Sequence, residues 1–256
     1  MVFAAAMFAF VALFVVTWGA LIVADVAYTD RAAVAEVLHS RPIRAALWLS
    51  VWTSLMSVAI GLVLAIPCGY ALSRYRFFGK ALVEAMIDLP ILMPPLIVGL
   101  SLLVFFQTPP GQAIERWGLQ FVFQPRGIVL CQVLVSVSFG IRAMKLAFDG
   151  VDPRLEHVAL TLGSSPAGAF FRVSLPLAWR GVVTAGALIW TRALGIFGPL
   201  MVLVGVVRER TEVLPTTIYL EQSIGRIEVA LAVALLMMGM AATALVMVRV
   251  VGLKER

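Results

Sequence analysis

The sequence predicts an all-α integral membrane protein with about six transmembrane helices, and its composition and the length of its apolar runs are the two observations that predict it. Of its 256 residues, 62% are hydrophobic and 13% are charged, whereas soluble domains are about half apolar and a quarter charged. The longest apolar runs exceed the roughly 20 residues that a helix needs to cross the hydrocarbon core of a bilayer. We therefore expect a single transmembrane domain over residues 1–256, embedded in the lipid bilayer as a multi-pass protein.

Six apolar runs mark the candidate spans, which are residues 2–26, 45–73, 87–106, 127–147, 181–207 and 227–251. The first run is free of charge from Met1 to Ala24. It is longer than the core of a signal peptide and lacks the basic leader, so it is interpreted as a retained helix.

Proline and glycine interrupt two of these spans. The third contains Pro90, Pro94 and Pro95, and prolines at this density bend a membrane helix or delay its start. The fifth contains the stretch RALGIFGPL, in which two glycines and a proline predict a kink or a local break.

The net charge of +6 comes from Lys and Arg that are scattered among the loops. No basic face with interleaved aromatic residues is present, which argues against nucleic acid as a partner. Lys and Arg are more frequent on the cytoplasmic side of membrane proteins. The segments 74–86 and 142–180 and the C-terminal segment carry more of them than the opposite loops, which predicts that both termini are cytoplasmic.

The loop 149–179, between the fourth and fifth spans, has the pattern of two short helices. In the first, apolar residues recur at i, i+3, i+4 and i+7, and these are Leu155, Val158, Ala159 and Leu162. Asp152 can cap this helix and Gly163 can end it, because a left-handed residue is favoured there. Ser165 and Pro166 then begin the second helix. The apolar face has two open interpretations: it packs on its own protein, or it is a docking surface for a soluble partner.

The loop resembles the cytoplasmic signature of permease subunits in binding-protein-dependent ABC importers. That signature reads Glu-Ala-Ala, three residues, Gly, nine residues, Ile-x-Leu-Pro. Here Gly163 is followed at that spacing by Val173-Ser174-Leu175-Pro176. His157-Val158-Ala159 stands in place of Glu-Ala-Ala, and Glu156 lies one position earlier.

Further stretches are similar to the molybdate, tungstate and sulfate permeases, and the resemblance covers residues 45–235. These stretches are LSRYRFFGKALVEAMIDLPILMPPLIVGLSLL, RALGIFGPLMVLVG and LPTTIYLEQSIG. In the second, Ile196 stands where that group has Glu. The resemblance implies import of an oxyanion, molybdate or tungstate first and sulfate next.

The resemblance also implies partners and a location. The partners are a second permease copy in a homodimer, two cytoplasmic ATP-binding subunits and an external substrate-binding protein, in a bacterial or archaeal cytoplasmic (inner) membrane. The loop would be the coupling loop that docks on the ATPase, and the residues assigned to it are Leu155, Glu156, His157, Val158, Ala159, Leu162, Gly163, Phe170, Phe171, Leu175 and Pro176.

The residues themselves indicate that the chain is a transport subunit and not an enzyme. The phosphate-binding pattern G-x-x-x-x-G-K-[ST] is absent, because Gly79-Lys80 is followed by Ala81. No catalytic set, metal-ligand spacing or cofactor motif is identifiable. The span interiors lack Asp and Glu, which argues against an ion-coupled secondary transporter. That class stays an alternative, as does an ABC permease for a polyamine, an iron chelate or an amino acid.

One charge, Arg192, lies about 18 Å along a helix from Arg180 and therefore near the middle of the membrane. Arg at that depth costs at least about 2.5 kcal/mol, so it is expected to face the protein interior. It either attracts an anion or binds helix carbonyls near the break, and the second role is favoured because the family carries this Arg in permeases of varied substrates. The residues assigned to a translocation path are Arg192, Gly195, Gly198, Pro94 and Pro95.

Overall fold

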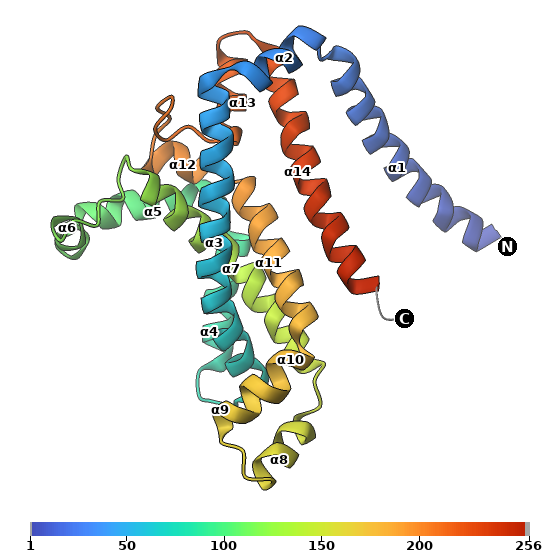
Figure 1. The fold of residues 1–256 in the computed structure, drawn as a ribbon, viewed down its shortest axis with the longest axis vertical. Helices are drawn as coiled ribbons and strands as arrows, with labels where there is room; N and C mark the ends of the chain where they lie inside the picture. Colours follow the sequence, from blue (N-terminus) through green and yellow to red (C-terminus); the bar gives the residue numbers. More distant parts are fainter. Residues whose placement is uncertain (1, 254–256) are drawn as a thin grey trace.

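The computed structural model describes residues 2–253, which form helices joined by mostly short loops (Figure 1). The first seven helices are α1 (Val2–Tyr28), α2 (Arg31–His39), α3 (Arg41–Arg74), α4 (Lys80–Leu92), α5 (Pro95–Gln107), α6 (Pro109–Arg116) and α7 (Pro125–Asp149). They are followed by α8 (Pro153–Thr161), α9 (Pro166–Ala169), the π-helical segment η1 (Phe170–Ser174), α10 (Leu175–Leu177), α11 (Trp179–Leu194), α12 (Gly198–Leu203), α13 (Leu214–Ser223) and α14 (Ile227–Leu253).

The all-α membrane fold is confirmed. Among the described helices, four are long and apolar enough to cross a membrane, and six spans result if each of two bent helix pairs counts as one. The straight candidates are Ala6–Tyr28, Arg41–Arg74, Pro125–Asp149 and Ile227–Val246. The bent pairs are α4 with α5, at 108°, and the segment Pro166–Leu177 with α11, at 72°.

Both breaks that proline and glycine predict are present. α4 ends before Met93, whose backbone is extended with ψ 142°, as expected for a residue that precedes a proline. α11 ends at Leu194 with Gly195 as its C-cap residue, and α12 begins at Gly198. α4 and α5 are therefore two short helices at a steep angle on either side of Met93 and Pro94.

The helix before the first break carries two carboxylates. α4 begins at Lys80 and contains Glu84 and Asp88. Asp88 accepts hydrogen bonds from both the Nε and Nη2 atoms of Arg142 on α7. This ion pair joins α4 to α7.

The core of the bundle is formed by α3, α7 and α11, with α3 running along most of its length (Figure 1). α3 and α7 approach closely where Gly69 faces α7. A Cβ atom built there would lie 2.6 Å from the Met144 Cβ atom and 2.8 Å from the Lys145 backbone N. Glycine at this position therefore permits the contact between the two backbones.

The N-terminal helix α1 leans away from this core and contacts α14 (Figure 1). None of the residues in its most apolar window is buried. At the same end of the bundle as the α1–α2 turn, α2 and α13 pack with α3 and α14 around a cluster that includes Leu214 and Val233.

Two buried carboxylates, Glu221 and Glu212, lie near this cluster. Glu221 is 1% exposed and forms ion pairs with Arg208 at 2.7 Å and with Arg226 at 3.3 Å. Glu212 is also 1% exposed; its Oε1 atom accepts a hydrogen bond of 2.9 Å from Thr217, and its Oε2 atom has no hydrogen-bond partner among the described residues. Burial raises the pKa of the Glu212 carboxyl, and the charge of Glu221 adds to this effect.

The Glu212→Gln variant is expected to be more stable than the original chain at pH 8, because it removes a buried negative charge that lies near the carboxylate of Glu221. A raised pKa in the folded state means that ionisation opposes folding. The stability of the original chain should therefore fall as the pH rises from about 4.3, the usual pKa of Glu, through the raised pKa. Thermal unfolding in detergent between pH 4 and 8 measures this difference.

The matched variant is Thr217→Val, which removes the hydroxyl that donates to Glu212. It should steepen the loss of stability at high pH, whereas Glu212→Gln should flatten it. Parallel pH profiles for all three chains would contradict the assignment.

Candidate functional site

The loop between α7 and α11 has the helix ends that its sequence predicts. Asp152 Oδ1 accepts a hydrogen bond of 2.9 Å from the Arg154 N–H, and Ser165 Oγ accepts one of 3.1 Å from the Gly168 N–H. Gly163 has a φ of 88°, in the left-handed region. We call residues 150–178 the α8 loop; in Figure 1 it lies at the opposite end of the bundle from α2 and α13.

Four of the apolar side chains assigned to docking lie on the surface of the α8 loop. Leu155, Val158 and Leu162 are 47%, 56% and 82% exposed, and Phe171 is 65% exposed. His157 and Pro176 are also exposed, and Ala159 is half-buried. The apolar stripe of α8 is therefore left uncovered by the described part of the chain.

Other assigned residues point into the protein instead. Phe170 packs with its ring centroid 4.7 Å from that of Tyr70 and 6.1 Å from that of Phe148. Leu175 is partly buried against the same α3–α7 core. These two residues attach the α8 loop to the bundle, while Gly163 forms the exposed turn between its helices.

Glu156 is buried, with 7% of its surface exposed, and it binds two residues of α3. It accepts a hydrogen bond of 2.7 Å from Arg74 Nε and one of 2.8 Å from the Tyr70 hydroxyl. Arg74 Nη2 also donates to the carbonyl oxygen of Val151 at 2.8 Å. Burial alone would raise the pKa of Glu156, but the hydrogen bonds from Arg74 and Tyr70 lower it below its usual value. The carboxylate is therefore ionised and internally paired.

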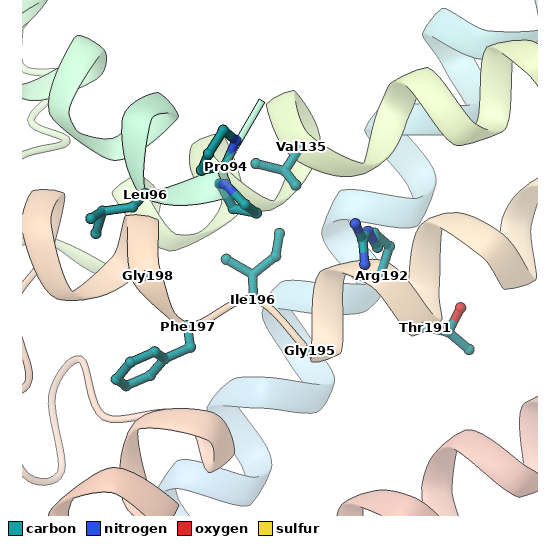
Figure 2. A pocket seen from close by; sticks show the side chains of 10 residues that line it. Pro94, Leu96, Val135, Thr191, Arg192, Gly195, Ile196, Phe197 and Gly198 are labelled. Carbon is teal, nitrogen blue, oxygen red and sulfur yellow. The ribbon is translucent and has the colours of Figure 1, made fainter. Parts of the chain in front are cut away.

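A cavity of about 340 Å³ lies where the two helix breaks face each other, and it brings together all five residues assigned to a path. It is lined by Pro94, Pro95, Leu96, Val135, Thr191, Arg192, Gly195, Ile196, Phe197 and Gly198. Figure 2 shows Pro94, Val135 and Arg192 arranged around a common space beside the Gly195–Gly198 stretch. The walls are mostly apolar, and Arg192 supplies a positive charge.

Arg192 lies in the last turn of α11, and its guanidinium carbon is 4.8 Å from the centre of the Phe139 ring. Within residues 2–253, no carboxylate forms an ion pair with it and no helix carbonyl accepts a hydrogen bond from it. The neighbouring Ile196 is apolar and 4% exposed. The contact that the structure shows for the Arg192 guanidinium group is the face of the Phe139 ring.

Gln132, which is absent from the predicted set, holds the end of α11 beside this cavity. Its side chain is 2% exposed; Nε2 donates to the Ala193 carbonyl at 3.2 Å, and Oε1 accepts from Ser57 Oγ at 2.9 Å. Trp190 Nε1 donates to Ser54 Oγ at 2.9 Å. A buried amide in an apolar helix is the sequence signal that could have indicated this network.

No cluster of three or more metal-ligating side chains occurs within the described ranges. The candidate site thus consists of the exposed apolar surface of the α8 loop at one end of the bundle and the cavity lined by Arg192 between the helix breaks.

Comparison with known proteins places the chain in one family. Residues 57–254 match the family described as "Binding-protein-dependent transport system inner membrane component". Over 179 residues the chain is 34% identical to the "Molybdenum transport system permease protein ModB" of Escherichia coli (strain K12), which covers 67% of this chain and 78% of that protein. It is also 34% identical over 167 residues to the "Molybdate/tungstate transport system permease protein WtpB" of Pyrococcus abyssi, covering 65% of this chain and 63% of that protein.

Solved structures share the fold. A bacterial ABC transporter "involved in the import of the acidic polysaccharide alginate" is similar with a TM-score of 0.73 at 17% identity, over 94% of this chain and 92% of that one. The MetNI methionine ABC transporter in an inward-facing conformation gives a TM-score of 0.62 at 17% identity, over 83% and 97% of the two chains.

Proposed function

Since this chain belongs to the family of binding-protein-dependent transport system inner membrane components, we propose that it is the permease that carries molybdate or tungstate through an ATP-driven importer. The similarity to molybdate and tungstate permeases supports the substrate class. The structural observation that carries the proposal is Arg192, a cation without a carboxylate partner among residues 2–253, in a cavity between two broken helices.

An oxyanion fits this cavity for a chemical reason. The guanidinium group offers N–H donors in a planar fork that matches the oxygens of a tetrahedral anion. The apolar walls keep the local dielectric low and strengthen that interaction. Because the walls offer few other polar groups, the anion is held weakly enough to leave, as a translocation path requires.

The energy is proposed to come from two ATP-binding subunits that dock on the α8 loop. The sequence lacks a phosphate-binding loop, and exposed apolar residues on a folded loop mark a contact with a protein partner. The contact is assigned to Leu155, Val158, Leu162 and Phe171, which are exposed. Glu156 is removed from the docking surface because it is buried and paired within the chain.

The remaining partners complete the two-sided path. A second copy of this permease would face the open side of the cavity, and an external substrate-binding protein would deliver the anion. With the α8 loop in the cytoplasm, the α2–α13 end faces outward, and the chain forms one domain in the inner membrane with both termini cytoplasmic.

The test is the molybdenum, tungsten and sulfur content of cells with and without the gene, grown at low external oxyanion and measured by mass spectrometry. We expect a selective fall in molybdenum or tungsten without the gene. A fall in sulfur alone would identify sulfate, rather than molybdate or tungstate, as the transported anion. No change in any of the three elements would leave another solute, such as a polyamine, an iron chelate or an amino acid.

In the same assay, Arg192→Gln is expected to lower uptake at least tenfold, because a hydrogen bond to a charged group contributes about 1.5–3 kcal/mol. Arg192→Lys should retain part of the activity, since it keeps the charge and loses the fork. Both variants must be present in the membrane at the level of the original protein. Unchanged uptake by Arg192→Gln would remove Arg192 from the path.

A further inference from the structure

The last turns of α3 hold three other parts of the chain. The Tyr70 ring packs edge-on against Phe148 of α7, with the centroids 5.3 Å apart, and against Phe170 of η1. Arg74 binds Glu156 of α8 and the Val151 carbonyl. One end of a single helix thus contacts α7, α8 and η1.

The link between α8 and α3 is polar rather than apolar. α8 packs mainly on α9 and η1, and a cavity of about 550 Å³ that includes Arg76 and His157 in its lining lies between α8 and the end of α3. Glu156 crosses this gap to reach Arg74, and both side chains are only 10% exposed. A shielded, charge-assisted pair of this kind is strong, and loss of one partner leaves a buried charge behind.

The same helix, α3, extends from this contact to the neighbourhood of the cavity between the broken helices. Ser57 lies thirteen residues before Tyr70, about 20 Å along the helix. Its hydroxyl donates to Gln132, whose amide donates to the Ala193 carbonyl beside the α11 break. Between these two points α3 packs along α7, and the two backbones approach closely at Gly69.

We propose that Glu156, Arg74 and Tyr70 couple α8 to α3, so that α3 transmits a displacement of the α8 loop to the cavity that Arg192 lines. The inference rests on the proposed function, because the displacement is the one that a docked ATPase imposes. The three residues are positioning residues: they touch neither the anion nor the ATPase. A displacement of the α8 loop therefore acts on α3 through these side chains, in addition to acting on α7 and α11, to which the loop is joined in the chain.

The experiment uses the complete transporter, purified from its native membrane through a tag on this chain and reconstituted into lipid vesicles with its binding protein. It measures molybdate transported per ATP hydrolysed. Glu156→Gln and Arg74→Gln are expected to retain ATP hydrolysis while this ratio falls about fivefold or more, since coupling energies between contacting groups are about 0.5–3 kcal/mol. Tyr70→Phe should give a smaller fall.

Two controls separate coupling from folding. The double variant Arg74→Glu with Glu156→Arg restores the pair with reversed charges and should recover at least half of the lost ratio. Lys80→Met removes the hydrogen bonds that the Lys80 Nζ atom donates to the Leu72 and Tyr75 carbonyls at the same end of α3; neither bond involves α8, so the ratio of this variant should match that of the original chain.

An unchanged ratio in assembled Glu156→Gln and Arg74→Gln complexes would overturn the inference. So would a proportional fall in transport and ATP hydrolysis, because a purely structural role predicts that result. If the charge variants do not assemble, the milder Tyr70→Phe variant provides the test, and an unchanged ratio of molybdate transported per ATP hydrolysed in that variant would overturn the inference. Failure of the original complex to move molybdate with ATP would instead refute the proposed function.

Discussion

Replacing Gly69 with alanine is expected to destabilise the bundle by about 3 kcal/mol, since inserting atoms into a close-packed core costs roughly 1–3 kcal/mol or more. The new methyl group would lie 2.6 Å from the Met144 Cβ atom and 2.8 Å from the Lys145 N atom. Neither atom is the end of a flexible side chain, so α3 and α7 must separate. Thermal unfolding in detergent and the amount of protein in the membrane measure the effect.

Gly186 on α11 offers the matched control. A Cβ atom there would have its nearest contact at 3.6 Å, with Leu62 Cδ1, which is ordinary van der Waals contact. Gly186→Ala is therefore expected to be neutral or slightly stabilising, because alanine favours a helix by about 1 kcal/mol over glycine. Equal melting temperatures for the Gly69 and Gly186 variants would contradict the close approach of α3 and α7.

Replacing Val158 and Leu162 together with glutamate is expected to weaken binding of the ATP-binding subunit about 100-fold or more, because single residues at the centre of an interface contribute 2 kcal/mol or more. The two side chains are 56% and 82% exposed, so the fold should be unaffected. Titration of the purified ATPase into permease in detergent measures the affinity, and the melting temperature of the permease alone checks the fold.

Trp117, at the end of α6, provides the comparison for this double variant. It is 85% exposed and lies outside the α8 loop. Trp117→Gln should leave the affinity unchanged. Full affinity in the Val158–Leu162 double variant would transfer the docking surface to another part of the chain.

The features predictable from the sequence are those that depend on neighbours in the chain. Run length and composition predict membrane helices, and prolines and glycines predict the two breaks because they act on their own backbone. Capping residues likewise predict the ends of α8. The five path residues lie together in the structure because the same glycines and prolines that identify the breaks also line the cavity.

Contacts between distant residues could not be predicted in this way. Arg74 and Glu156 are 82 positions apart, and Gln132 and Ala193 are 61 apart. No local pattern relates the members of either pair. The ion pair between Asp88 and Arg142, which are 54 positions apart, is a third example.

The position of α1 has a consequence for how the protein is made. α1 leaves the ribosome before α14, the helix that it contacts. Until α14 has been synthesised, α1 therefore lies in the lipid without this contact. A helix can do so because its backbone hydrogen bonds are satisfied internally. The α1–α14 contact can form only after α14 has been synthesised, so a chain interrupted before α14 would leave α1 without this contact.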